Sequence, residues 1–483
     1  EFVENGEILG EIDGAAGENT LDYSLYNSEL NLNIEGQTAS GLGTFQNITN
    51  VVGTMGNSDQ LIGSTGNDTF LITDSNSGQV NNTITFSAIE IINGNQGSNS
   101  LDYSQYVDSA IAINLGALEA TGLSAFSQIN NFIGTSEATD QLIGSGNNTI
   151  FELSGPGMGK INDTFSFSAI ERLNGGNGGD DANNRIVSNA ANTTWRITNT
   201  NAGDLIENNI AIASFENIQN LETTGAENGE TEAFFSTPTA QITGSLNSGN
   251  NNLSLVGNDI NIGNGIGNIQ GATISGQGTL KIRPVENSID IVLGGVDSQR
   301  SNELSLTEGE LAAIQAGFIS ILIGGEDQVG SVRLGGDARF QDSVVLRSQA
   351  DIDTRNGQLL TDNGALTLET GGALFGRNIA SQNQAVTLTA QQSIDVNTVV
   401  AGGGTGITAT SEAGSVTINN SLNSSGALIG SNINITANDD VTLGTLVTTG
   451  DQLSGDVRVV SRLGSFTTDG ITTTNSMDIN KTG

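Results

Sequence analysis

Residues Asn19–Tyr26 read NTLDYSLY, and nearly the same letters return at Asn99–Tyr106 as NSLDYSQY. The hexapeptide DQLIGS at Asp59–Ser64 likewise returns at Asp140–Ser145. The first motif returns at an offset of 80 and the second at an offset of 81. Because unrelated segments do not share several landmarks in the same order, the sequence predicts two tandem long repeats.

A third landmark suggests a half-period inside each long repeat. The segment TFSAIEIINGNQG from Thr85 is matched from Thr164 by TFSFSAIERLNGGNG, aligned with two extra residues inside. The pattern Phe-x-x-Ile recurs, and the steps between its phenylalanines are 41, 40, 41 and 48. About 40 residues would make two turns of roughly 20 residues in a stacked repeat. The five copies are Phe45/Ile48, Phe86/Ile89, Phe126/Ile129, Phe167/Ile170 and Phe215/Ile218.

Short apolar–polar alternations predict strands with one buried face, as in residues 30–34 (LNLNI) and 111–115 (IAINL). After about residue 241 such strands are separated by Gly, Asn or Asp, roughly every 8–12 residues. That spacing also fits a sandwich or a barrel. We prefer an all-β parallel β-helix (β-solenoid), because the strands are nearly interchangeable and lack the long connections of Greek keys.

One helix is expected in this all-β chain. Thr307 and Glu310 form a capping-box pattern, apolar residues follow, and Gly317 offers a stop. The sequence therefore predicts a short lateral helix of roughly two turns near 307–317.

The repeats and composition shifts divide the chain into six segments, of which 222–240 is acidic and breaks the pattern. The predicted boundaries are 1–18 (acidic N-terminal segment), 19–98 (long repeat 1), 99–182 (long repeat 2), 183–221 (degenerate third repeat), 222–240 (linker or lateral loop) and 241–483 (second β-helix).

Composition narrows the function. The net charge of −38 disfavours nucleic acid and anionic membranes as partners and attracts divalent cations. The chain has no Cys and no His, so it lacks the commonest general base and the usual zinc ligands. No apolar run approaches the ~20 residues needed to span a bilayer, so no direct membrane insertion is expected. The chain begins at Glu1 without a signal peptide, which we interpret as a processed or excised piece of a larger protein.

The repeat motifs LDYSxY, INLG, ATG and DxLIGS resemble the long repeats of giant bacterial exoproteins, especially cyanobacterial ones. The C-terminal half, in particular the segment beginning at Asn302 (NELSLTEGELAAIQAGF), is similar to filamentous-haemagglutinin-type passengers. The resemblance covers most of the chain. It implies a right-handed parallel β-helix, secretion to the bacterial cell surface or extracellular matrix, and roles in attachment, aggregation or matrix building.

Calcium is the one cofactor that the sequence suggests. Residues 63–70 (GSTGNDTF) approximate the nonapeptide in which turn carbonyls and Asp carboxylates hold Ca²⁺, and weaker relatives lie at 94–102 and 175–181. The candidate ligands are Asp68, Asp102 and Asp181. Because each ion of a β-roll is shared by successive tandem copies and these copies are isolated, plain Gly/Asn turns are the favoured alternative.

All four tyrosines of the chain fall in the LDYSxY motif: Tyr23, Tyr26, Tyr103 and Tyr106. Aromatic pairs can form a sugar-binding platform, but they can equally stack between turns and close the core, which we favour.

We therefore expect a structural protein rather than an enzyme: a stiff extracellular rod for attachment, aggregation or filament assembly. Roughly 20 residues per turn and ~4.8 Å per turn predict a rod on the order of 110 Å. Expected partners are further copies of the chain, end to end or laterally, and a carbohydrate or cell-surface ligand. The alternative is a polysaccharide-binding or polysaccharide-cleaving β-helix, but basic residues are too scattered to show a sugar cleft in any one stretch.

Overall fold

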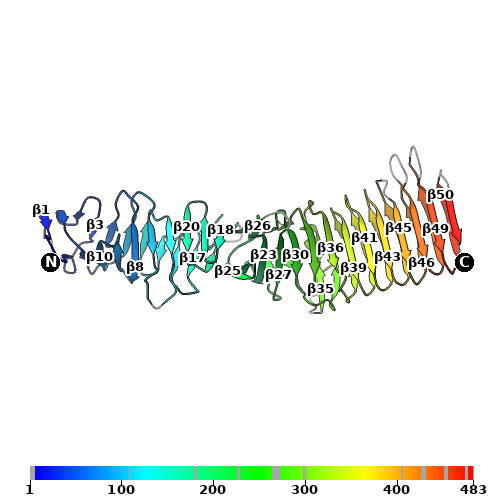
Figure 1. The fold of residues 1–483 in the computed structure, drawn as a ribbon, viewed down its shortest axis with the longest axis horizontal. Helices are drawn as coiled ribbons and strands as arrows, with labels where there is room; N and C mark the ends of the chain where they lie inside the picture. The colour runs from blue at the N-terminus through cyan, green and yellow to red at the C-terminus, as the bar shows by residue number, and fades with distance from the viewer. Residues whose placement is uncertain are drawn as a thin grey trace. The chain divides into compact units, whose positions relative to one another are not determined.

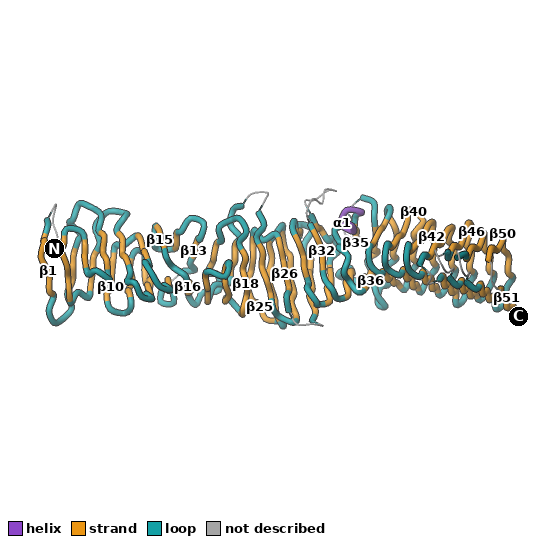
Figure 2. Tube along the Cα trace, turned by 90° about the horizontal axis from the view of Figure 1, so that it is seen from above, coloured by secondary structure: helices purple, strands orange, loops and turns teal. Residues whose placement is uncertain are grey.

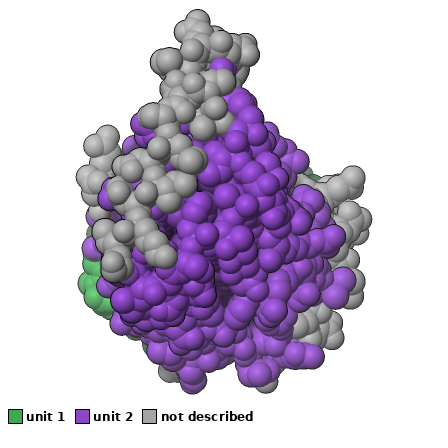
Figure 3. Space-filling model, turned by 90° about the vertical axis from the view of Figure 1, so that its right-hand side faces the viewer, with its two compact units in different colours: residues 1–189, 204–219 green, residues 190–203, 220–483 purple. Residues whose placement is uncertain are grey.

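The computed structural model describes residues 6–107, 109–178, 182–225, 229–263, 272–296, 300, 302–403, 406–425, 431–450, 455–473 and 477–481. The chain is all-β with long, mainly parallel sheets, compatible with a β-solenoid (Figure 1). It divides into two compact units, coloured separately in Figure 3. Unit 1 is residues 1–189 and 204–219, and unit 2 is residues 190–203 and 220–483; β24 (Ala202–Glu207) has residues in both.

In unit 1 the chain alternates between strand stacks, and one stack contains eleven strands. In order of pairing these are β2 (Thr20–Asp22), β6 (Asn50–Val52), β10 (Ile84–Ser87), β9 (Ser77–Val80), β8 (Thr69–Asp74), β12 (Ser100–Asp102), β16 (Asn131–Ile133), β20 (Phe165–Ser168), β19 (Met158–Ile161), β18 (Ile150–Gly155) and β22 (Arg185–Ser188).

The other strands of unit 1 fall into two groups. The first, in order of pairing, is β1 (Ile8–Asp13), β5 (Leu42–Gln46), β4 (Thr38–Ala39), β3 (Asn31–Asn33), β7 (Gln60–Ile62), β11 (Ile91–Asn93) and β15 (Ala125–Ser127). The second is β13 (Ala112–Asn114), β14 (Glu119–Ala120), β17 (Gln141–Ile143), β21 (Arg172–Asn174) and β25 (Ile210–Glu216).

The stacking order is not the chain order, because the chain reverses direction once in each half-repeat. β8 pairs with β9 and β9 with β10, both antiparallel, while β10 pairs in parallel with β6 and β8 with β12. The same reversal occurs over β18, β19 and β20. β3, β4 and β5 also pair antiparallel in sequence. β13 and β14 pair antiparallel, and an isolated antiparallel bridge joins Ala120 to Leu123 just before β15.

These reversals correct two predictions. The sequence predicts uniformly parallel strands and turns of roughly 20 residues. In unit 1, however, parallel partners such as Leu21 and Val51, or Val51 and Phe86, are 30 and 35 residues apart. One long repeat advances the stack by five strand spacings, from β2 to β12, which is about 24 Å.

The Phe-x-x-Ile pattern marks the end of each reversal. Each Phe lies on the last strand of its reversal or on β25, and every Phe and Ile of the five copies is buried. The residue just before each Ile has a left-handed backbone, with φ between 53° and 57°. These residues are Asn47, Ala88, Gln128, Ala169 and Asn217.

The carbonyl of that left-handed residue lies against a glycine that directly follows the paired strand. A Cβ on Gly53 would lie 1.8 Å from the Ala88 oxygen, and a Cβ on Gly134 would lie 1.8 Å from the Ala169 oxygen. No side chain can occupy that space, so close backbone approach requires glycine. Gly14, Gly94 and Gly175 meet their left-handed partners in the same way, at 2.5, 2.3 and 2.2 Å.

The structure also changes the alignment of the two long repeats. The Ile150 amide donates to the Asn162 side chain as the Thr69 amide does to Asn81, and Phe167 pairs as Phe86 does. The repeats therefore match at a constant offset of 81 through this region, and the predicted two-residue insertion is wrong.

Unit 2 contains long parallel stacks, and its described strands from Glu230 onward pair without such reversals. In one, Leu346 pairs with Leu368, Leu368 with Leu388 and Leu388 with Ala409, so that turns of about 20 residues follow one another as predicted. Its strands are β23 (Asn192–Asn199), β27 (Glu230–Phe235), β30 (Asn252–Val256), β33 (Thr279–Arg283), β36 (Ser320–Gly324), β39 (Val344–Ser348), β41 (Leu366–Thr370), β43 (Val386–Ala390), β45 (Ile407–Ser411), β47 (Ile433–Ala437), β49 (Val457–Ser461) and β51 (Met477–Lys481).

A second long parallel stack of unit 2 is accompanied by shorter strands. The long stack is β35 (Glu303–Leu306), β34 (Asp290–Leu293), β37 (Val332–Leu334), β40 (Ile352–Thr361), β42 (Leu374–Ser381), β44 (Ile394–Ala401), β46 (Val416–Asn423), β48 (Val441–Thr448) and β50 (Phe466–Thr473). The shorter strands are β26 (Asn220–Thr223), β29 (Ser245–Asn247), β32 (Thr273–Ser275), β28 (Gln241–Ile242), β31 (Asn261–Ile262) and β38 (Ala338–Phe340).

The predicted helix is present but shorter than expected. α1 (Glu308–Ala312) is the one helix among the described residues and lies beside β35 (Figure 2). Its capping box is complete: the Thr307 hydroxyl accepts from the Glu310 amide at 3.2 Å, and the Glu310 carboxylate accepts from the Thr307 amide at 2.8 Å.

The predicted linker at 222–240 is not a linker throughout. β27 lies inside it and pairs in parallel with β23 and β30. Thr231, Ala233 and Phe235 face the core, whereas Glu230 and Glu232 alternate with them. The segment is therefore a strand with a period of two, which its acidic residues made hard to recognise in the sequence.

Replacing Gly134 tests the backbone contact. We expect Gly134→Ala to lower the free energy of unfolding by about 3 kcal/mol or more, since its Cβ would overlap the Ala169 carbonyl. Gly66→Ala is the matched control, because its nearest neighbour would be the Ser64 hydroxyl at 3.5 Å. Chemical denaturation followed by circular dichroism measures both, and equal stability of the two variants would contradict the contact.

Candidate functional site

Asp68, the first calcium candidate, is 2 % exposed, and its carboxylate is hydrogen-bonded within its own turn and to a side chain from a later turn. It accepts hydrogen bonds from the Ser64 amide at 2.7 Å, from the Ser64 hydroxyl at 3.0 Å and from the Asn81 side-chain amide at 2.6 Å. The Gly-rich motif thus forms a turn in which the Asp68 carboxylate already accepts hydrogen bonds from the protein. This arrangement is the one expected of a plain Gly/Asn turn.

The other two candidates do not join Asp68. Asp102 lies on β12, and its Oδ1 accepts from the Ser104 amide at 2.8 Å, an Asx turn. Asp181 lies outside the described residues. Within the described ranges no group of three or more acidic side chains is placed to hold a metal ion. Calcium binding therefore stays a prediction.

The two tyrosine pairs divide into a buried and a partly exposed member. Tyr23 and Tyr103 are fully buried, and their hydroxyls donate to the Ser40 and Thr121 carbonyls at 2.9 and 2.7 Å. Burial raises the pKa of both hydroxyls well above the ordinary value of 10.0. Tyr26 packs edge-on against Tyr23 at 5.4 Å between ring centroids.

The second pair repeats this arrangement. Tyr106 packs against Tyr103 at 5.5 Å, and Tyr26 and Tyr106 keep partial exposure. A sugar contact through Tyr23 or Tyr103 is not supported, since neither ring reaches the surface.

Buried Asx side chains form the corners between turns of unit 1. Asp59 accepts from the Leu30 amide at 2.7 Å and the Thr54 amide at 2.6 Å, and Asp140 repeats this with Ile111 at 2.8 Å and Thr135 at 2.5 Å. Asn99 forms a further corner, where its side-chain amide nitrogen donates to three backbone carbonyls. These polar residues stabilise the stack and are not available for chemistry.

Two glutamates beside these corners have raised pKa values. Burial, followed by the carboxylate of Asp59, raises the pKa of Glu90, and burial together with Asp140 raises that of Glu171. The two sites differ in their partners. Glu90 accepts from the Asp59 amide at 3.1 Å and from the Asn76 side chain at 2.8 Å.

Glu171 lacks the second of these donors. Gly157 stands where the first repeat has Asn76, as shown by the amides of Ile170 and Ile89, which donate to the Gly157 and Asn76 carbonyls. The Oε2 atom of Glu171 is buried without a hydrogen-bond partner. An unpartnered buried carboxylate oxygen destabilises the fold when the group is ionised.

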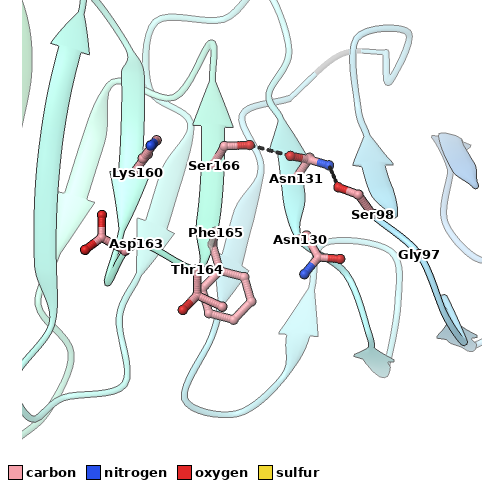
Figure 4. A pocket seen from close by; sticks show the side chains of 9 residues that line it. All are labelled: Gly97, Ser98, Asn130, Asn131, Lys160, Asp163, Thr164, Phe165 and Ser166. Carbon is pink, nitrogen blue, oxygen red and sulfur yellow. Dashed lines mark hydrogen bonds between the residues drawn. The ribbon is translucent and has the colours of Figure 1, made fainter. Parts of the chain in front are cut away.

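A shallow groove with a volume of about 290 Å³ lies in unit 1. It crosses the starts of β16 and β20, the end of β19 and the turn before β12 (Figure 4). Its floor is a chain of polar side chains: the Ser166 hydroxyl donates to Asn131, which donates to the Ser98 hydroxyl at 3.1 Å. Lys160, Asp163, Asn130 and Phe165 also line the groove.

Sequence reasoning missed this groove because its residues come from three separate segments of the chain, between Gly97 and Ser166, and match no motif. The one signal available was the divergence between the two long repeats. Comparison of the chain with protein-family models, with curated proteins and with solved structures finds no match. No helix in the described part of the chain is long and apolar enough to cross a membrane.

Neutralising Glu171 tests the buried carboxylate oxygen. Because folded Glu171 binds its proton more tightly than the unfolded residue, the free energy of unfolding falls as the pH rises from its ordinary pKa of 4.5 through the raised folded value. We expect Glu171→Gln to stabilise unit 1 by about 1 kcal/mol at pH 7, since solvent screens part of the effect at this half-buried side chain. Below about pH 4 the substitution should have no effect.

The control is Glu90→Gln, which should gain less, since both carboxylate oxygens of Glu90 accept hydrogen bonds. Denaturation midpoints at several pH values give the comparison. A pH-independent effect of Glu171→Gln would contradict this account.

Proposed function

We propose that the chain is a right-handed β-solenoid that forms a stiff structural element of an extracellular bacterial adhesin or surface fibre. The observation that carries the proposal is that recurring polar residues form the corners of the stack. Asp59, Asn99 and Asp140 are buried, and their side chains hydrogen-bond to the backbone of neighbouring turns. Such residues favour a scaffold over a reactive site. Right-handedness is supported by the strong preference of parallel crossover connections for that hand.

Rigidity is supported by the stacked interior. In unit 2 the inward residues Leu368, Leu388 and Ala409 are fully buried and lie in register on neighbouring strands. Each of these turns is therefore held both by backbone ladders and by apolar packing, and neither disulfides nor thiols contribute, since the chain has no Cys.

The outer surface supports an extracellular location. On the same strands Thr367, Thr387 and Thr408 lie in register on the opposite face, where they are partly exposed. Uncharged hydroxyls in place of Lys and Glu, together with a net charge of −38, fit a secreted structural protein more than an intracellular one.

Self-association belongs to the proposal. A parallel stack has an unpaired backbone edge on its outermost strand, and such an edge is a template for another strand. β1, whose one partner among the described strands is β5, also exposes Leu9. End-to-end contact between copies would continue the ladder.

Electron microscopy of the purified chain at neutral pH, with and without EDTA, tests the proposal. We expect elongated particles or fibres, with a cross-β spacing of about 4.8 Å along the axis in fibre diffraction. Loss of fibres in EDTA would add calcium as the link between copies. Compact, round particles would contradict a structural rod.

A further inference from the structure

The groove of unit 1 holds polar groups that the fold does not use. Among the described residues, the Lys160 ammonium, the Asp163 carboxylate and the Asn130 side-chain NH₂ have no hydrogen-bond or ion-pair partner. The Asn130 oxygen, by contrast, accepts from the Asn99 amide at 3.3 Å. Donors and an acceptor therefore line the same groove, on either side of Phe165 (Figure 4).

An aromatic ring lies among these groups. Phe165 is half-buried, with its ring 5.9 Å from that of Phe132, which is in the core. The contact with Phe132 holds one side of the Phe165 ring, and the rest of the ring borders the groove. The floor is fixed as well, because Ser166, Asn131 and Ser98 are hydrogen-bonded to one another. The ring and the floor of the groove are thus preorganised.

The first long repeat has the same fold without this chemistry. At the offset that superposes the two reversals, Lys160, Asp163 and Phe165 correspond to Gln79, Asn82 and Ile84. Gln79 and Lys160 hold the same place on the middle strand of their reversals. The fold therefore does not require these two charged side chains or an aromatic ring at these positions.

We propose that this groove binds a neutral glycan through about one or two monosaccharide units. A pyranose ring has an apolar C–H face that packs on an aromatic ring, and hydroxyls that both donate and accept. Asp163 would accept from hydroxyls, while Lys160 and Asn130 would donate to them. The volume of about 290 Å³ lies at the lower end of small-ligand pockets and suits that size.

Charge decides against an acidic glycan. Asp163 lies in the groove itself, and the chain as a whole carries a net charge of −38, so a polyanion would be repelled. The inference rests on the proposed function, since an extracellular surface protein is one that meets such glycans.

The test is an array of neutral oligosaccharides, including cellotetraose, maltotetraose and mannotetraose, followed by calorimetry with the strongest binder. The variant K160Q/D163N/F165I replaces three groove residues with their counterparts from the first repeat, so the fold should tolerate it. We expect its affinity to fall by at least about tenfold. K281Q, at a partly exposed strand lysine of unit 2, is the charge control and should bind normally.

Two results would overturn the proposal: no binding by the unaltered chain to any probe up to about 10 mM, or equal binding by the triple variant. If the triple variant is unstable, F165I and D163N alone decide, each expected to weaken binding. Electron microscopy keeps the two proposals separate, because fibres or rods without glycan binding refute only the groove. Glycan binding by round particles would refute only the structural role.

Discussion

Unit 1 depends on the close contact between a glycine at the end of one strand and the carbonyl of a residue with left-handed backbone at the end of the paired strand. The contact occurs five times, and in each case the glycine amide also donates to the residue before the left-handed one, at 2.8 to 3.0 Å. The chain can come this close because the glycine has no Cβ. Its effect is to end one strand, turn the backbone and place the following Ile in the core, as Ile89 and Ile170 show.

The chain reversals end at this contact, and they shape the surface. After β18 the chain runs back as β19 and forward again as β20, so that Lys160 lies on the middle strand and Phe165 begins the last. Asn131 comes from the next parallel strand. The groove is thus a product of the reversal. In unit 2, where the long stacks are purely parallel, one turn follows another without reversal from Leu346 to Val459.

Much of the fold could be predicted from the sequence, because it depends on local patterns. Strand alternation, the half-repeat marked by Phe86 and Phe126, and the capping box at Thr307 are all visible in the sequence and are present in the structure. The reversals were not predicted, since a short strand such as β9 has the same apolar–polar pattern whether it runs parallel or antiparallel. The left-handed backbone of Ala88 and Ala169 could not be predicted either, because alanine, unlike Gly or Asn, does not favour that conformation.

The candidate sites were harder to predict because they depend on long-range placement. Asp68 matched a calcium motif, but its carboxylate is used by Ser64 and by Asn81, which comes from a different turn. Tyr23 was a candidate sugar contact, with core packing the favoured alternative, and it is buried. The groove needs Asn130 and Lys160 together, and only the stacking order brings them to one place.

Amide hydrogen exchange at the ladder glycines tests the central contact most directly. The amides of Gly53, Gly94, Gly134 and Gly175 each donate across to the next strand beneath a left-handed turn. The account predicts that these amides exchange only through global opening of unit 1 and share one high protection factor. Exchange at the rate of exposed loop amides such as that of Gly66 would contradict it.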